Sequence, residues 1–164
     1  MALLYYLWID YVFGPEATTE TVYQGLGKRI VESFVKGING LLLWSGYEYI
    51  GTIFAYGQTS SGKTYTMHGD ESSPGLLYLA SKDIFDYIAR TTDREFILRG
   101  SYVELYKEEV KDLLDPSTPS LRIRESYERG VYVESKEEVI HNYTDLLNVW
   151  SFSFSNRIVI TYRW

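Results

Sequence analysis

Residues 57–64 read Gly-Gln-Thr-Ser-Ser-Gly-Lys-Thr, and this octapeptide decides the fold. It satisfies the pattern G-x-x-x-x-G-K-[S/T] in full. The segment before it, residues 52–56, is short, apolar and bounded by glycines, which predicts a buried strand. A short helix is expected from residue 63 to about residue 67, stopped by Gly69. A strand, a loop and a helix in this order form the setting in which the pattern has chemical meaning.

Each part of the octapeptide has a chemical purpose. Glycines let several backbone N–H groups converge on phosphate oxygens, and the helix that follows directs its positive end to the same point. Lys63 would reach the β- and γ-phosphates, and Thr64 would offer its hydroxyl to Mg²⁺. A chain of this length matches the pattern by accident only about 0.5% of the time. The sequence therefore predicts a nucleotide-binding loop.

Composition narrows the class of protein. The 164 residues suffice for one domain with a core, and 45% hydrophobic with 23% charged residues is ordinary for a globular chain. A net charge of -6 argues against non-specific nucleic-acid binding, which needs clustered cations. The absence of cysteine excludes disulfides. Only His68 and His141 could supply imidazole ligands, so we do not expect a metal cluster.

Two apolar stretches raise the question of a membrane. Residues 1–9 lack the basic start and the small-residue cleavage site of a signal peptide. Residues 38–57 are long enough to cross a bilayer, but Glu48 near the middle costs about 2.5–3.5 kcal/mol on insertion scales. We therefore expect a soluble chain with no membrane partner.

Three helices are expected beside the one after the loop. The first has Thr18 or Thr19 as its cap, Gly37 or Gly40 as its end, and an apolar stripe of residues four apart. The stripe consists of Val22, Leu26, Ile30, Phe34 and Ile38. A second long helix is capped by Ser72, Ser73 and Pro74. Its expected inner face is Leu77, Ala80, Ile84, Phe85 and Ile88. A last helix covers residues 144–150.

The remaining pattern predicts strands over residues 96–106, 121–124 and 131–133. Helices and strands together indicate an α/β fold whose sheet is covered on both faces. The charged run at residues 136–138 is expected to be a solvated face.

Several blocks resemble the motor domain of kinesins. Residues 51–69 are similar to the family's N-G-T-I-F-A-Y segment and phosphate loop, and residues 10–13 with 21–23 resemble its F-D-x-V-F…V-Y stretch. Residues 101–116 are similar to S-Y-x-E-I-Y-N-E…D-L-L-x-P. The chain resembles the centromere-associated branch most. The resemblance covers about 10–40 and 52–148 of a single incomplete motor domain.

The resemblance implies a P-loop NTPase-like fold with an incomplete mixed central sheet and helices on both faces. It implies ATP and Mg²⁺ as ligands, the microtubule as partner, and a place in the cytoplasm on the cytoskeleton. Tyr65 would lie against the adenine, with helix packing as the alternative. Residues 122–129 would face tubulin, with a solvated basic edge as the alternative. The implied ligand-binding residues are Gly57, Gln58, Thr59, Ser60, Ser61, Gly62, Lys63, Thr64 and Tyr65, with Thr64 on the metal.

Three departures from the family bear on activity. The Arg-x-Arg-Pro clamp has no counterpart before Asp10, and neither Ser-Ser-Arg-Ser-His nor Asp-Leu-Ala-Gly-Ser-Glu occurs in the sequence. Because these last two segments position water and charge around the γ-phosphate, we expect no hydrolysis by these residues alone, and no catalytic residue is assigned. Residues 41–51 interrupt a run that the family keeps continuous, and residues 150–164 are unlike it; their alternation suggests an unpaired strand.

Two other interpretations stay open. The chain could be a non-catalytic remnant or interaction fragment from a mis-assembled gene, with retained non-coding sequence at residues 1–7, 41–51 and 150–164. It could also be an unrelated phosphate-loop enzyme, which would need an acidic residue at the end of a later strand. None of the later strands ends in such a residue.

Overall fold

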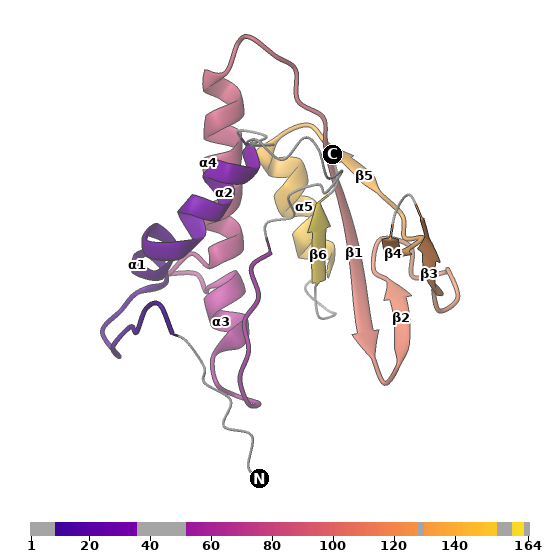
Figure 1. The fold of residues 1–164 in the computed structure, drawn as a ribbon, viewed down its shortest axis with the longest axis horizontal. Helices are drawn as coiled ribbons and strands as arrows, with labels where there is room; N and C mark the ends of the chain where they lie inside the picture. Colours follow the sequence, from indigo (N-terminus) through magenta and orange to yellow (C-terminus); the bar gives the residue numbers. More distant parts are fainter. Residues whose placement is uncertain (1–8, 36–51, 128–129, 154–158, 163–164) are drawn as a thin grey trace. The chain divides into compact units, whose positions relative to one another are not determined.

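The computed structural model describes residues 9–35, 52–127, 130–153 and 159–162 (Figure 1). The chain forms two compact units, residues 1–87 and residues 88–164, and each is described by itself. The 41–51 insert lies outside the described residues. So does most of the 38–57 stretch considered for a membrane. Among the helices that are described, none is both long and apolar enough to traverse a lipid bilayer.

The first unit is helical apart from its loops. The predicted first helix is present as three segments: α1 (Thr19–Val22), a π-helical turn η1 (Tyr23–Gly27) and α2 (Lys28–Val35). Thr18 caps it as expected, since its Oγ1 accepts a hydrogen bond from the Thr21 N–H at 3.1 Å. The short helix after the loop is α3 (Lys63–His68), and the second long helix is α4 (Leu76–Arg90).

The buried face of the first helix differs from the predicted one. Its core residues are Tyr23, Gly27, Val31 and Val35, again four apart but one position later. The Tyr23 side chain explains the shift. Its hydroxyl donates to Asp83 Oδ2 at 2.9 Å, and a Cβ at Gly27 would lie 2.7 Å from the ring. The ring therefore lies over the glycine in the π turn, and this side of the helix faces α4.

The segment at residues 52–56 is extended, but it is not the buried strand that we predicted. Its side chains alternate, with Ile53 and Ala55 half-buried while Phe54 and Tyr56 are 79% and 95% exposed. No described residue forms a sheet ladder with it. The apolar composition indicated a strand covered on both faces, and here only one face of the segment is covered.

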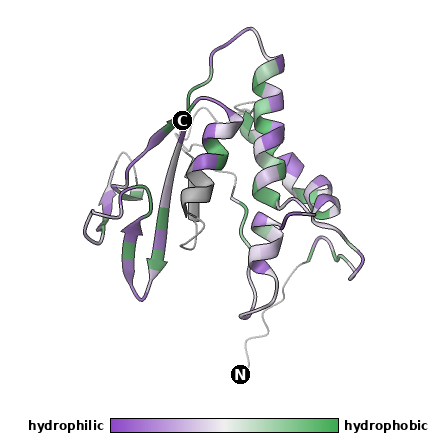
Figure 2. Cartoon of the chain, turned by 180° about the vertical axis from the view of Figure 1, so that it is seen from behind, coloured by the Kyte–Doolittle hydropathy of each residue, from purple (hydrophilic) through white to green (hydrophobic). Residues whose placement is uncertain are grey.

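The connection between α3 and α4 is tighter than expected. Ser72 and Ser73 do not cap α4; their N–H groups donate to Asp70 Oδ1 at 2.8 and 2.9 Å. Pro74 pairs with Gly69 in an isolated bridge, and α4 starts two residues later. Apolar and polar residues alternate around α4 (Figure 2). Its buried positions are Leu76, Leu79, Ser81 and Ile84, of which the sequence predicted only Ile84.

The second unit is built around strand β1 (Leu98–Tyr106), which confirms the prediction over residues 96–106. It pairs antiparallel with β2 (Glu109–Asp112), β5 (Glu138–Ile140) and β6 (Val159–Tyr162). A separate hairpin joins β3 (Ile123–Ser126) to β4 (Gly130–Val133). Helix α5 (Tyr143–Ser153) confirms the last predicted helix. All of the described pairings are antiparallel. The tail strand was expected to be unpaired, and that expectation is wrong because β6 pairs with residues 100–103.

A two-residue turn joins β1 to β2. Lys107 and Glu108 both have positive φ, 49° and 66°, as a type I′ hairpin turn requires. Such turns favour Asn and Gly because side chains with a Cβ are strained there. Lys107 and Glu108 therefore close this hairpin although their side chains disfavour the positive φ of the turn.

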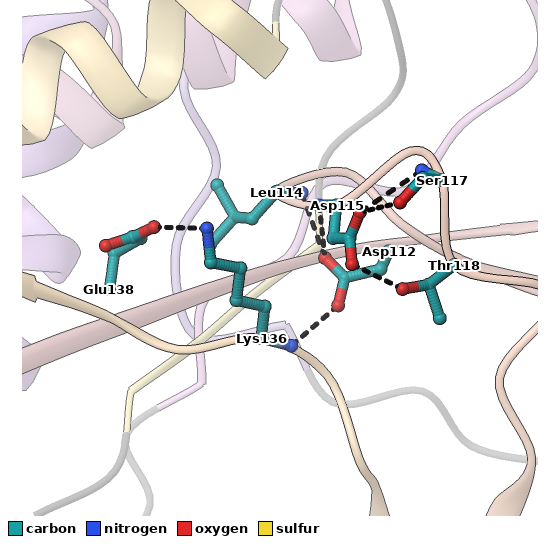
Figure 3. A network of polar contacts seen from close by, with 7 residues as sticks. All are labelled: Asp112, Leu114, Asp115, Ser117, Thr118, Lys136 and Glu138. Atoms are coloured by element: carbon teal, nitrogen blue, oxygen red, sulfur yellow. Dashed lines mark hydrogen bonds and ion pairs between the residues drawn. The ribbon is translucent and has the colours of Figure 1, made fainter.

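A buried carboxylate ties the end of β2 to the segment before β5 (Figure 3). Asp112 is 4% exposed and accepts three backbone N–H groups: from Leu114 at 2.9 Å, Asp115 at 3.2 Å and Lys136 at 2.6 Å. Lys136 also pairs through its ammonium with Glu138 at 2.7 Å. The charged run at 136–138 exposes its side chains as expected, but it also anchors the sheet through its backbone.

Candidate phosphate-binding site

The loop at residues 57–64 joins the extended segment 52–56 to α3, as the sequence predicted (Figure 1). Ser60 and Gly62 adopt left-handed backbone conformations, with φ of 63° and 89°. The Ser61 N–H donates to the Gln58 carbonyl at 3.2 Å and closes the turn. Left-handed residues in a tight turn direct successive N–H groups to one side, which produces a concave anion-binding surface.

The two glycines of the motif have different reasons to be glycine. At Gly57 a Cβ would press on the Ser61 hydroxyl, which would have to rotate away. At Gly62 there is space for a Cβ, but the φ of 89° disfavours any side chain. Gly62 also accepts the Thr66 N–H at 2.9 Å, which starts α3.

The Lys63 side chain folds back over the loop. Its ammonium donates to the Gly57 carbonyl at 2.8 Å and to the Gln58 carbonyl at 2.5 Å. An ammonium has three N–H donors, so one remains for a further acceptor. The single positive charge is thereby held against the loop, where an incoming phosphate oxygen would be attracted to it.

The other expected ligand-binding residues lie around this loop. Gln58, Thr59, Ser60, Ser61 and Thr64 are exposed, and Thr64 lies in the first turn of α3 with its side chain accessible to solvent. Tyr65 is 47% exposed. The alternative that Tyr65 is a core packing residue does not agree with this exposure.

A pocket of about 430 Å³ adjoins the loop within the first unit. One wall is the helix face formed by Val22, Leu26 and Ile30. These are residues of the stripe that the sequence assigned to the core. The rest of the described lining comes from Gly27, residues 52–56, Ser61, Lys63, Thr66 and Leu76. The pocket could not be predicted from the sequence, because periodicity does not distinguish a core face from a pocket face.

Titratable groups add little chemistry to the loop. Burial lowers the pKa of His68, at the end of α3, below the usual value for histidine. His141 is exposed, and its backbone N–H, not its imidazole, donates to Asp145 Oδ2 at 3.2 Å. Among the described residues, no three histidine or carboxylate side chains are placed to hold a metal ion.

The region expected to face tubulin, residues 122–129, contains β3 of the β3–β4 hairpin, and its residues 128–129 lie outside the described residues. Arg124 pairs with Glu134 at 2.9 Å, and both side chains are more than half exposed. Ile123 and Val131 are 61% and 70% exposed, and Tyr127 is fully exposed. The hairpin thus presents apolar and charged groups together to solvent.

Comparisons with known proteins give a consistent result. The kinesin motor domain family matches residues 6–163. The chain is 52% identical over 132 residues to the kinesin-like protein KIN-7M, chloroplastic, of Arabidopsis thaliana, a match that covers 80% of this chain and 11% of the relative. It is 46% identical over 149 residues to the kinesin-like protein KIN-7I of Oryza sativa subsp. japonica, covering 90% of this chain and 11% of the relative.

The family match extends over nearly the whole chain and includes the phosphate loop and β1. It confirms the expected α/β fold of the P-loop NTPase class, of which the described helices and antiparallel strands are an incomplete set. The chain spans about a tenth of the length of these relatives. This chain belongs to the kinesin motor domain family.

Proposed function

We propose that this chain is the ATP-binding portion of a microtubule motor domain. The observation that carries the proposal is the loop geometry: left-handed Ser60 and Gly62, with the Lys63 ammonium held over the loop by two carbonyls. Backbone N–H groups between residues 57 and 64 would hold the phosphates, and Lys63 would exchange a carbonyl for a phosphate oxygen.

The residues present fit Mg·ATP. Thr64 has an exposed hydroxyl one position after the lysine, as the metal requires, and half-exposed Tyr65 leaves a ring face for the adenine. Bound Mg²⁺ would neutralise charge on the phosphates. The binding residues in this proposal are those from Gly57 to Tyr65, and Thr64 alone contacts the metal.

We further propose that residues 1–164 do not hydrolyse ATP by themselves. Phosphoryl transfer to water depends on groups that orient the water and stabilise charge at the γ-phosphate. The two segments that do this in kinesins do not occur in the sequence. Binding without turnover is therefore the expected behaviour of these residues.

The partner in this proposal is the microtubule, contacted through the β3–β4 hairpin. Exposed Ile123, Val131 and Tyr127, beside the Arg124–Glu134 pair, support a role in recognition. We also propose a location in the cytoplasm on microtubules, with descent from the centromere-associated branch. Relatives bear the names KIN-7M, chloroplastic, and KIN-7D, mitochondrial, so a fluorescent fusion imaged beside all three compartments tests the location.

Calorimetric titration of Mg·ATP and Mg·ADP into the purified chain tests the proposed function. We expect binding by the parent chain and a loss of roughly tenfold or more for Lys63→Ala, because the charge-assisted hydrogen bonds to phosphate disappear. Lys107→Ala, at the hairpin turn of the second unit, is the matched control and should bind like the parent. Equal affinity of parent and Lys63→Ala would refute the proposal. Microtubule-stimulated turnover would refute the claim that hydrolysis is lost.

A further inference from the structure

The first helix carries two apolar stripes, and only one of them is used in the core. Tyr23 and its partners four residues apart are buried, whereas Leu26 is 37% exposed and lies with Val22 and Ile30 along a pocket. Apolar side chains that line a pocket without filling it form a surface that an apolar ligand can cover.

Other described residues of the lining are also apolar. Ile53 and Ala55 are half-buried, and Leu76 at the start of α4 contributes a further aliphatic side chain. The pocket volume of about 430 Å³ falls within the range of roughly 300–1,000 Å³ typical of small-molecule sites. It is large enough for a ligand with two fused or linked rings.

The charge of the lining has one sign. Among the described residues that line the pocket, Lys63 is the charged one and none bears a carboxylate. Two of the ammonium donors are used by Gly57 and Gln58, which leaves one N–H. The hydroxyl groups of Ser61 and Thr66 lie in the same lining. A single negative charge on a ligand would therefore find one cation and hydroxyl-bearing residues in an otherwise largely apolar lining.

A buried hydrogen bond ties together the elements that form the walls. Tyr23 donates to Asp83 Oδ2 at 2.9 Å and so joins η1 to α4, the two helical elements that bear Leu26 and Leu76. Gly27 makes room for the ring, since a Cβ there would lie 2.7 Å from it. This bond resists a collapse that would close the pocket.

We propose that this pocket is a binding site for an amphipathic monoanion: a flat aromatic or aliphatic body that carries one sulfonate or carboxylate. The body lies between the Leu26 stripe and the 52–56 segment, and the anion accepts the remaining Lys63 N–H. Such a ligand has neither a ribose nor a polyphosphate. Its binding does not require the proposed nucleotide function, but it competes with polyphosphate for Lys63.

Fluorescence titration with 1-anilinonaphthalene-8-sulfonate tests the site, with N-phenyl-1-naphthylamine as the same ring system without the charge. We expect saturable binding of about one sulfonate dye per chain. Leu26→Gln should weaken it roughly fivefold by removing apolar contact. Lys63→Gln should weaken it roughly tenfold by removing the charge-assisted hydrogen bond. The uncharged dye should respond to Leu26→Gln and not to Lys63→Gln.

Leu105→Gln is the matched control, because Leu105 is a 63% exposed leucine on β1 in the second unit. It should bind the dye like the parent, and circular dichroism should show equal helix content in all variants. Binding of several dyes per chain that neither Leu26→Gln nor Lys63→Gln weakens would overturn the proposal. So would equal losses for Leu26→Gln and Leu105→Gln.

Mg·ATP added to the dye complex separates this proposal from the nucleotide proposal. A raised apparent Kd for the dye supports shared use of Lys63. If the dye binds in a way that depends on Leu26 but ATP does not bind, the pocket proposal stands and the nucleotide proposal is refuted. If ATP binds but no dye binding depends on Leu26, the nucleotide proposal stands and the pocket proposal is refuted.

Discussion

Replacement of Asp112 by asparagine changes one oxygen into an NH₂ group at a site where the chain presents only donors. The parent carboxylate accepts N–H groups from Leu114, Asp115 and Lys136 and is 4% exposed (Figure 3). An asparagine keeps one acceptor oxygen, which can serve either the Leu114 and Asp115 pair or Lys136. The NH₂ group of the asparagine then faces the remaining backbone N–H group or groups, so that buried donors oppose each other without an acceptor.

The expected loss follows from the number of hydrogen bonds. Hydrogen bonds to a charged group contribute about 1.5–3 kcal/mol, and an unpaired buried donor costs about 1–3 kcal/mol. Asp112→Asn removes the charge and leaves one side unsatisfied, so we expect a loss of about 2–3 kcal/mol. Asp112→Ala leaves all three N–H groups without an acceptor, and we expect about 3–5 kcal/mol.

Urea unfolding followed by circular dichroism measures this loss. For a unit of this size, 2–3 kcal/mol should lower the unfolding midpoint by roughly 1–2 M urea. The control is Asp115→Asn, because the Asp115 carboxylate accepts hydrogen bonds from Ser117 and Thr118 but is solvated, and its effect should be much smaller. An Asp112→Asn midpoint equal to that of the parent, or of the control, would refute the account of this carboxylate as a buried hub.

Three further predictions concern single residues. Lys107→Asn should stabilise the β1–β2 hairpin by roughly 0.5–1 kcal/mol in urea unfolding, because asparagine tolerates the positive φ; a loss of stability would contradict the I′ turn. Gly27→Ala should cost about 1–3 kcal/mol, since its Cβ would press on the Tyr23 ring, while Gly14→Ala, in open space, should cost much less. For His68, burial lowers the pKa in the folded chain, so the unfolded chain binds more protons; stability should fall as the pH drops through about 6.5, and His68→Gln should flatten that dependence in thermal melts. A parent chain equally stable at pH 5.5 and 7.5 would contradict it.

The sequence predicted the phosphate loop, α3 and β1 well because each is determined locally. The loop depends on glycines at fixed spacing, and β1 is a long run of aromatic and branched residues. Glycine spacing and side-chain branching limit the backbone of such segments to few conformations, and β1 also has the partner strands that it needs.

The predictions that failed depend on contacts that are distant in sequence. The predicted buried stripe of the first helix started at Val22, whereas the observed one starts one residue later, at Tyr23. The reason is that Tyr23 hydrogen-bonds to Asp83, sixty positions away, and periodicity contains no information about that bond. The segment at 52–56 was predicted to be a buried strand, but a strand needs a partner, and composition cannot supply one. Asp112 appeared only as part of a family motif, and its role follows from the backbone of Lys136.

We propose that backbone amides of residues 57–64 and one ammonium form a cradle for polyphosphate. Amide NMR spectra of the ¹⁵N-labelled chain, recorded during titration with Mg·ADP, test this proposal. We expect the largest shifts on the N–H groups of Ser60, Ser61, Gly62 and Lys63, and we expect these shifts to be absent in Lys63→Ala at the same ligand concentration. Saturable binding whose largest shifts fall on β1 or the β3–β4 hairpin, with the loop amides unmoved, would contradict it.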